Sequence, residues 1–244
     1  MSINYFLVDN LEYMSTIPDN FYDLAIADPE QAKGQHGGKF YSAGQIQKNG
    51  KKTFVKGTFH KKKKWDKSLP SDKYFSELFR ISKHQIIWGC QYYDTNFGPG
   101  RIIWDKVNDG AHQYSCELAY NSLNDRTEIF RYMWGGMMQG KSMGEGYVQK
   151  GNKALNEKKI HPTQKPTALY QWIFHDFKIP LKWKIFDPNL GSGSIGIVCD
   201  KMGYSLDACE NDLDYFNEAG LWLKSERVKN NTNQYNLFKT KNPD

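Results

Sequence analysis

The stretch KIFDPNLGSGSIGIVCDKMGYSLDACE, residues 184–210, decides the fold that this sequence predicts. Ile185-Phe186 is a short apolar run typical of a buried strand. Asp187-Pro188 ends that strand, because proline cannot donate to a continuing β ladder. Gly191 and Gly193 follow, and without a Cβ they would let a ligand approach the backbone closely. The stretch therefore opens with a strand and a tight glycine turn.

A helix and a second strand complete this unit. Ser194 is a candidate cap for a helix with an apolar face, and Gly203 would end that helix. The apolar face consists of Ile195, Ile197 and Val198. Residues 204–209 predict the next strand, with Glu210 at its end. Strand, helix and strand in alternation indicate an α/β sheet.

Glu210 and Asp187 limit the ligand that such a unit would take. An acidic side chain at the end of the second strand can accept both hydroxyls of a ribose. The glycine spacing differs from the dinucleotide fingerprint, and Asp187 would repel a diphosphate. It would suit a ligand with an amino group, such as S-adenosylmethionine. The turn alone leaves open an ordinary strand–turn–helix with a surface glutamate.

Composition places the chain among globular, intracellular proteins. Its 244 residues fit one large domain, and its formal net charge of +6 favours an anionic partner. The four cysteines lack a paired metal-ligand spacing, so we expect reduced, mostly buried thiols, a cytoplasmic location and no metal. No apolar run is long enough to span a bilayer, and no secretory pattern opens the chain; we expect no membrane partner.

The N-terminal part predicts two strands with polar ends. Residues 3–8 form the first, followed by Asp9 and a short helix over residues 11–17. Residues 23–27 form the second, which ends in Asp28-Pro29-Glu30-Gln31. Open α/β sheets bind ligands beyond such strand ends. We therefore expect both ends to face one site.

Residues 33–67 change in character to glycine, lysine and polar residues, with no acidic residue before Asp66. The densest basic run contains Lys61, Lys62, Lys63 and Lys64. Such a loop suits a nucleic-acid backbone, with a solvated loop as the alternative. Its aromatic residues favour nucleic acid, because bases stack on aromatic rings.

The middle of the chain predicts more of the sheet. Ser71 or Asp72 would cap a helix to about residue 82, and strands follow at 86–89, 102–105, 115–121 and 127–134. The last two would pair antiparallel through a turn at Asn124-Asp125. Residues 135–159 form a long glycine-rich stretch, and loops of that length are functional or disordered.

His161-Pro-Thr-Gln-Lys-Pro166 precedes a helix to about residue 177. Its prolines fix the backbone, and Lys165 supplies a charge that could meet a carboxylate; a rigid helix entry is the alternative. Asp212 would cap the last helix, and we expect the polar tail from about Asn230 to fray.

Three motifs together resemble the amino-methylating DNA methyltransferases of the N6-adenine and N4-cytosine type. They are residues 8–29, residues 161–166 and the loop at residues 187–194. Their order, catalytic segment first and cofactor loop last, is similar to the β class. The resemblance implies a Rossmann-like, S-adenosylmethionine-dependent fold: a mixed, mostly parallel sheet of about seven strands with helices on both faces. It implies a single domain over residues 1–244.

The resemblance also implies roles for individual residues. Asp187, Pro188 and the turn Gly191, Ser192 and Gly193 would hold the methionine part of the cofactor. Glu210 would accept its ribose hydroxyls, and Thr163 and Lys165 would lie near its carboxylate. Asp9 would lie near its adenine, although capping a helix is an equally simple role for Asp9.

The catalytic tip departs from the family pattern. The family has Asp-Pro-Pro and an aromatic residue, where this chain has Asp28-Pro29-Glu30-Gln31. The Asp carboxylate and the first Pro carbonyl accept the N–H bonds of the target amine, and the aromatic ring stacks on the flipped base. Gln31 cannot stack, which removes ~1–3 kcal/mol. Glu30 adds a negative charge beside the target pocket.

The function implied by the resemblance is N6-methylation of adenine in double-stranded DNA, without a cysteine nucleophile. Residues 33–67 and 135–159 would contact DNA, the latter as a target-recognition loop. The altered tip keeps open a second hypothesis, a cofactor- or DNA-binding protein without catalysis, as a homodimer or a partner subunit. Methylation of cytosine N4 or of an RNA base is a third.

Overall fold

The structure is a computed structural model. It describes residues 1–31, 44–46, 52–54, 68–107, 114–135, 138–140, 157, 159–160 and 163–240. From residue 230 onward it describes the backbone alone. Among these residues, no helix is long and apolar enough to cross a membrane.

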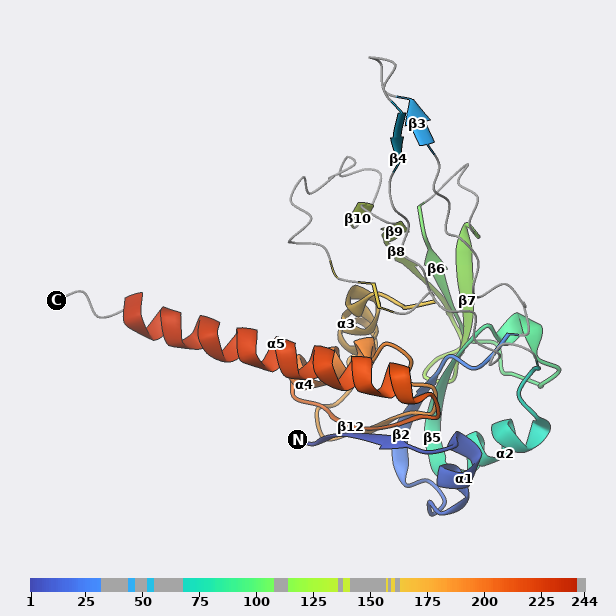
Figure 1. Ribbon diagram of the computed structural model, residues 1–244. Helices are drawn as coiled ribbons and strands as arrows, with labels where there is room; N and C mark the ends of the chain where they lie inside the picture. Colours follow the sequence, from blue (N-terminus) through green and yellow to red (C-terminus); the bar gives the residue numbers. More distant parts are fainter. Residues whose placement is uncertain are drawn as a thin grey trace.

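Strands and helices alternate as an α/β fold requires (Figure 1). The strands are β1 (Ile3–Leu7), β2 (Tyr22–Ala27), β3 (Gly44–Ile46), β4 (Lys52–Phe54), β5 (Ser82–Trp88), β6 (Arg101–Asp105), β7 (Cys116–Asn121), β8 (Thr127–Arg131), β9 (Met133–Gly135), β10 (Met138–Gly140), β11 (Lys184–Asp187) and β12 (Ser205–Glu210). The helices are α1 (Asn10–Ser15), α2 (Asp72–Ile81), the 3-10 turn η1 (Cys90–Tyr92), α3 (Thr167–Asp176), α4 (Ser194–Met202) and α5 (Leu213–Thr240).

Eight strands form the main sheet, in the order β1-β12-β11-β2-β5-β7-β6-β8. The first five strands of this order, from β1 through β12, β11 and β2 to β5, run parallel to one another. Strand β7 runs antiparallel to both of its neighbours, β5 and β6. Two small hairpins, β3–β4 and β9–β10, stand apart from this sheet. The predicted fold class, a mixed and mostly parallel sheet with helices on both faces, is confirmed.

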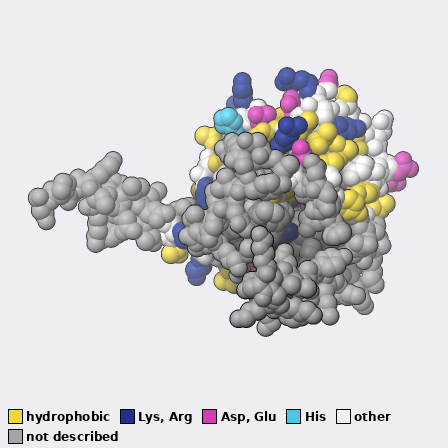
Figure 2. Space-filling view, turned by 90° about the horizontal axis from the view of Figure 1, so that it is seen from above, with side chains coloured by type: hydrophobic (Ala, Val, Ile, Leu, Met, Phe, Trp, Pro, Cys, Tyr) yellow, Lys and Arg dark blue, Asp and Glu magenta, His cyan; other side chains and the backbone are white. Residues whose placement is uncertain are grey.

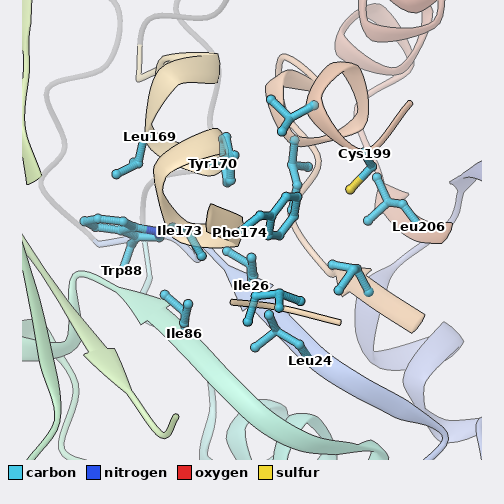
Figure 3. Packing of buried hydrophobic residues seen from close by; sticks show 14 of the residues in the cluster. Leu24, Ile26, Ile86, Trp88, Leu169, Tyr170, Ile173, Phe174, Cys199 and Leu206 are labelled. Carbon is cyan, nitrogen blue, oxygen red and sulfur yellow. The ribbon is translucent and has the colours of Figure 1, made fainter. Parts of the chain in front are cut away.

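The alternation of side chains along β2 divides the core into two layers. Leu24 and Ile26 face α3 and α4, where Figure 3 shows them below Ile173 and Phe174. The alanines between and after them face α1 and α2, against residues such as Leu78. Both faces of the strand are therefore dry, which explains its continuous apolar sequence. Burying a side chain such as Leu24 contributes ~1.5–3 kcal/mol.

The predicted antiparallel direction of residues 115–121 and 127–134 is confirmed, but these strands do not pair with each other as a hairpin. Strand β6 lies between β7 and β8 and pairs with both, and the predicted second strand divides into β8 and β9. The connection passes over the start of β6 at Gly100, where an added Cβ would lie 2.0 Å from the Asn124 carbonyl oxygen. A glycine is needed there, so that the β7–β8 loop can cross β6 closely.

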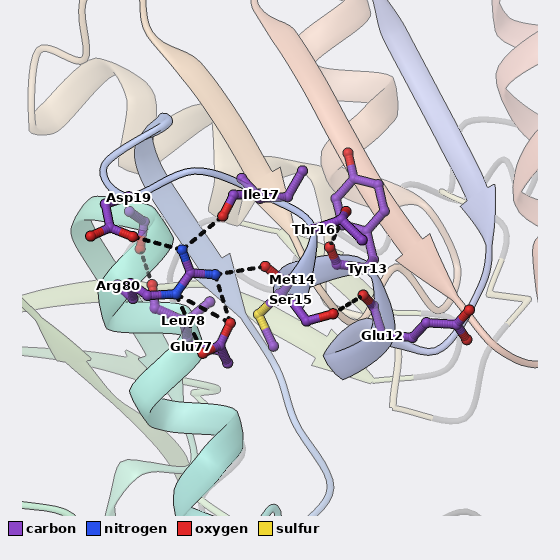
Figure 4. A network of polar contacts seen from close by, with 11 residues as sticks. Glu12, Tyr13, Met14, Ser15, Thr16, Ile17, Asp19, Glu77, Leu78 and Arg80 are labelled. Carbon is purple, nitrogen blue, oxygen red and sulfur yellow. Dashed lines mark hydrogen bonds and ion pairs between the residues drawn. The ribbon is translucent and has the colours of Figure 1, made fainter.

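Arg80 joins α2 to α1 and the turn that follows α1 (Figure 4). Its guanidinium pairs with Asp19 and Glu77, both at 2.7 Å, and donates to the carbonyl oxygens of Met14 and Ile17. The planar guanidinium has enough donors to hold four partners at once. This cluster holds α1 and α2 together on one face of the sheet.

Helix ends agree with most predicted caps. Ser71 rather than Asp72 caps α2, and Asp212 accepts hydrogen bonds from the backbone N–H groups at the start of α5. Ser194 is instead the first residue of α4, whose N-cap is Gly193. The predicted fraying from Asn230 is also wrong, because α5 continues to Thr240.

The predicted state of the cysteines is confirmed. All four thiols are free, and Cys90, Cys199 and Cys209 are buried while Cys116 is exposed. Among the described residues, no cluster of potential metal ligands occurs.

Candidate active site

One pocket lies where the parallel strands β1, β2, β11 and β12 end. Because β11 lies between β12 and β2, Asp187 is flanked by Glu210 on one side and Asp28 on the other. The lining residues are Val8, Asn10, Asp28, Glu30, Thr163, Gln164, Lys165, Tyr170, Pro188, Asn189, Leu190, Gly191, Ser192, Ser194, Cys209, Glu210, Asn211, Asp212 and Tyr215. The three motifs, far apart in the sequence, therefore meet at one site, as predicted.

Asp187 is a buried carboxylate that does not line this pocket itself, although the next two residues do. Its Oδ1 accepts a hydrogen bond from the Asn189 N–H at 2.9 Å. Burial raises its pKa to about 7, and the negative charges of Asp28 and Glu210 add to that rise. A cationic ligand near Asp187 would offset the cost of burying its charge.

Glu210 is oriented by the backbone around it. Its Oε2 accepts from the Gly191 N–H at 2.8 Å, and its Oε1 accepts from the Asp212 N–H at 2.9 Å. Each carboxylate oxygen retains a lone pair for a further donor. Burial raises the pKa of Glu210, while these two hydrogen bonds lower it. The arrangement suits a ligand with two adjacent hydroxyls.

The two glycines of the turn serve different purposes. Both have positive φ values, 52° at Gly191 and 78° at Gly193, which favour glycine. Gly191 lines the pocket, as predicted. Gly193 does not: a Cβ there would lie 2.9 Å from the Ala219 Cβ of α5. The glycine at this position allows close packing of the turn against α5, and its role in ligand approach stays a prediction.

The segment before α3 brings Thr163, Gln164 and Lys165 to the pocket wall. Lys165 is buried although it lines the pocket. Its Nζ forms ion pairs with Asp28 Oδ2 and, at 3.4 Å, with Glu117 Oε2 of β7. Burial lowers its pKa, but the two carboxylates outweigh burial and raise it overall. The charge that we predicted to meet a carboxylate thus meets Asp28 within the chain itself.

Glu157 anchors this segment from the glycine-rich stretch. Its carboxylate accepts from the Thr167 N–H at 3.0 Å and the Thr167 hydroxyl at 2.6 Å, at the start of α3. Its other oxygen accepts from the Gln164 amide at 2.9 Å. Because Pro166, the N-cap residue, has no side-chain hydrogen bond to offer, Glu157 supplies the missing cap.

The catalytic tip is held on several sides. Asp28 Oδ1 lies 3.5 Å from the Gln31 amide nitrogen, a long hydrogen bond. The Pro29 carbonyl oxygen accepts from the Tyr93 hydroxyl at 3.0 Å. Glu30 lines the pocket. The Gln31 side chain packs on Gly89, where an added Cβ would lie 2.5 Å from its Nε2.

A model of the DNA methylase family for N6 and N4 methylation matches residues 32–221. The chain belongs to this family. The match spans most of the described pocket and begins directly after Gln31. Members of the family depend on S-adenosylmethionine, which is therefore the cofactor of this chain.

Named relatives of this DNA methylase chain are distant. Type II methyltransferase M2.LlaDCHI of Lactococcus lactis subsp. cremoris is 27% identical over 138 residues, 53% of this chain and 43% of the relative. Type II methyltransferase M2.DpnII of Streptococcus pneumoniae is 27% identical over 143 residues, 58% of this chain and 47% of the relative. The match thus spans less than half the length of either relative.

A solved structure of M1.HpyAVI covers 91% of this chain and 98% of its own, at 17% identity and a TM-score of 0.49. This likeness adds nothing to what the family model shows.

The pocket of this DNA methylase chain fits its cofactor. S-adenosylmethionine carries a ribose, an ammonium and a sulfonium. Glu210 presents two backbone-oriented oxygens for the ribose hydroxyls, and a cation near Asp187 would favour the ionised form of this carboxyl. Pro188, Gly191 and Ser192 line the same wall.

Asp9 takes the alternative role weighed for it. Its carboxylate accepts from the Glu12 N–H at 3.1 Å and caps α1. The neighbouring Asn10, which we did not predict, lines the pocket instead and donates to the Pro188 carbonyl oxygen at 3.3 Å.

Glu117 and Glu157 were also missed by the sequence reasoning. No motif contains them, and the only signal was an acidic residue inside an apolar strand or a glycine-rich stretch. The candidate DNA contacts Lys61, Lys62, Lys63 and Lys64 lie outside the described residues. On the face in Figure 2, the described surface mixes basic with acidic side chains.

Proposed function

We propose that this chain is a DNA adenine N6-methyltransferase. The observation that carries the proposal is that Asp28, at the end of β2, lines the same pocket as Glu210 and the glycine turn. Aspartate rather than serine before the proline favours adenine over cytosine, by the family resemblance. The cofactor, when bound, supplies the methyl group.

The chain's own residues would act on the target amine. A carboxylate oxygen of Asp28 accepts one N–H of the exocyclic amine, which turns the nitrogen lone pair away from the ring. Lys165 holds the other side of that carboxylate. The Pro29 carbonyl oxygen has a second lone pair beside the one used by Tyr93, so it can accept the other N–H.

The base has to leave the duplex to reach Asp28, which lies in a pocket at the sheet edge. We propose double-stranded DNA as the substrate, contacted by residues 33–67 and 135–159. The basic charge of the first stretch supports this proposal, because lysines offset phosphate charge.

A second candidate is a binding protein without catalysis, as a homodimer or as a partner subunit. The packing of Gln31 favours it, because this side chain lies on Gly89 and against Asp28 instead of offering a ring to a base. The loss of stacking at ~1–3 kcal/mol per base would weaken productive binding about ten- to a hundredfold.

The test is nucleoside mass spectrometry on unmethylated plasmid DNA incubated with the protein and S-adenosylmethionine. N6-methyldeoxyadenosine is the expected product, and D28N should abolish it. D23N is the matched control: Asp23 lies at the opposite end of β2 and pairs with Lys83. N4-methyldeoxycytidine instead, or product only on RNA, would favour the third hypothesis.

The double variant E30P/Q31Y separates the two main candidates. If stacking is what the tip lacks, turnover should rise about ten- to a hundredfold. No product from either protein, with cofactor binding intact in a thermal-shift assay, would support the binding protein.

A further inference from the structure

Four side chains of alternating charge form a row that leads away from the pocket. Asp28 pairs with Lys165, Lys165 with Glu117 Oε2 at 3.4 Å, and Glu117 Oε1 with Lys106 Nζ at 2.6 Å. They come from the end of β2, the segment before α3, the strand β7 and the residue after β6. Only the first two line the pocket.

We propose that Glu117 is a positioning residue for the Asp28 carboxylate and acts on it through Lys165. The proposal rests on the proposed function, because it assigns Asp28 to the target amine. It adds a residue from outside the three motifs to the catalytic machinery.

Burial of Lys165 is the first reason. Water cannot share its charge, so the two carboxylates divide it between them. The Nζ lies 5.1 Å from the centroid of the Trp88 ring, which limits the space in which it can move. How tightly Lys165 holds Asp28 therefore depends on how strongly Glu117 attracts the same ammonium.

The ionisation of Glu117 is the second reason. Burial would raise its pKa, but Lys165 and Lys106 outweigh burial and lower it to about 2. Glu117 is thus ionised at neutral pH. Without that charge, Lys165 would attract Asp28 alone, and the Asp28 oxygens would be poorer acceptors for an N–H bond.

The kinetic test compares E117Q with E128Q. Gln keeps the shape of the side chain and removes its charge, and Glu128 is a carboxylate on β8 that pairs with Arg126 away from the pocket. We expect E117Q to lower kcat about tenfold with the KM values for DNA and cofactor unchanged, since Glu117 does not line the pocket. E128Q should match the wild type.

E117D keeps the charge on a shorter side chain and should retain more turnover than E117Q. A purely structural role would not distinguish charge from shape in this way. Wild-type kcat in E117Q, or equal losses in E117D and E117Q, would overturn the proposal.

A second test does not depend on methylation. The melting temperatures of the wild type, E117Q, D28N and E117Q/D28N form a double-mutant cycle. Each single change leaves Lys165 one carboxylate, whereas the double change leaves it none. We expect the double variant to lose more than the sum of the two single losses, and the E128Q/D28N control to be additive.

The two tests separate the possible failures. Additive losses for E117Q and D28N would overturn the coupling through Lys165, whatever the protein catalyses. If the wild type makes no methylated base while the cycle is non-additive, the proposed function fails and the coupling stands. A non-additive cycle with the expected fall in kcat supports both.

Discussion

Two cations in this molecule each join two carboxylates, and their surroundings differ. Arg80 has 30% of its side chain exposed, and its partner Asp19 is 71% exposed. Lys165 has 3% of its side chain exposed, between Asp28 and Glu117. The first cluster, around Arg80, links α1 to α2 at the surface. The second lies at the pocket where the three motifs meet.

This difference in burial determines how much each cluster depends on its individual partners. Water screens the Arg80 pairs, so each partner can be lost at small cost. Water does not screen the buried Lys165 in this way. The loss of one of its two carboxylate partners therefore changes its interaction with the other. Ion pairs of similar length therefore have unequal consequences, and the variants below are ordered by the expected size of their effect.

K165M should have the largest effect. It leaves Asp28 and Glu117 without their shared cation in a partly buried site, and breaking a buried pair costs about 3–5 kcal/mol. Urea denaturation should show that loss, and methylated product should disappear. K83M is the control, because Lys83 is a half-exposed lysine that pairs with Asp23. If K165M and K83M were equally stable, burial would not make the Lys165 ion pairs more important for stability than an exposed pair.

D187N should stabilise the cofactor-free protein while weakening cofactor binding. Asp187 has a pKa raised from 3.8 to about 7, so the folded state binds its proton more tightly than the unfolded chain does. Stability from this group is full below about pH 4 and is lost as the pH rises to about 7.

The melting temperature of D187N should therefore exceed that of the wild type by about 10 °C at pH 8. The difference should shrink toward pH 5, where the wild-type carboxyl is protonated. S-adenosylmethionine should raise the melting temperature of the wild type and not that of the variant. A constant difference across this pH range would show that Asp187 does not carry a raised pKa.

E157A should have an intermediate effect. The Glu157 carboxylate caps α3 and holds Gln164, and the loss of a helix cap costs ~0.5–2 kcal/mol. Denaturation would measure that loss, with E218A on an exposed turn of α5 as the control. Because α3 follows Lys165, turnover should fall with stability; unchanged values of both would exclude Glu157 as the anchor of this segment.

D19N should have the smallest effect. It removes one exposed partner of Arg80, whose bonds to Glu77 and to the Met14 carbonyl oxygen remain. We expect a melting temperature within about 2 °C of the wild type, measured at low and at moderate salt. A loss of stability as large as that of E157A would mean that the exposed Arg80 pairs contribute as much as a helix cap.

The local pattern of the chain was enough to predict most elements and the catalytic edge of the sheet. The apolar run at residues 185–186, for example, ends at Asp187. The carboxyl ends of parallel strands lie at the same edge of a sheet, and this holds for any order of the strands. Hydrophobic periodicity and turn residues are local signals, so one sequence carries them.

Tertiary structure alone decided which side chains meet. The sequence predicted a hairpin where β6 separates β7 from β8, because nothing local shows that the loop can cross at Gly100. The sequence predicted a positive charge at Lys165 but did not identify Glu117 as its partner. Glu117 lies on β7, the strand next to β5 in the sheet. Strand order and charge pairing depend on contacts between distant segments, and their energies exist only once the sheet has formed.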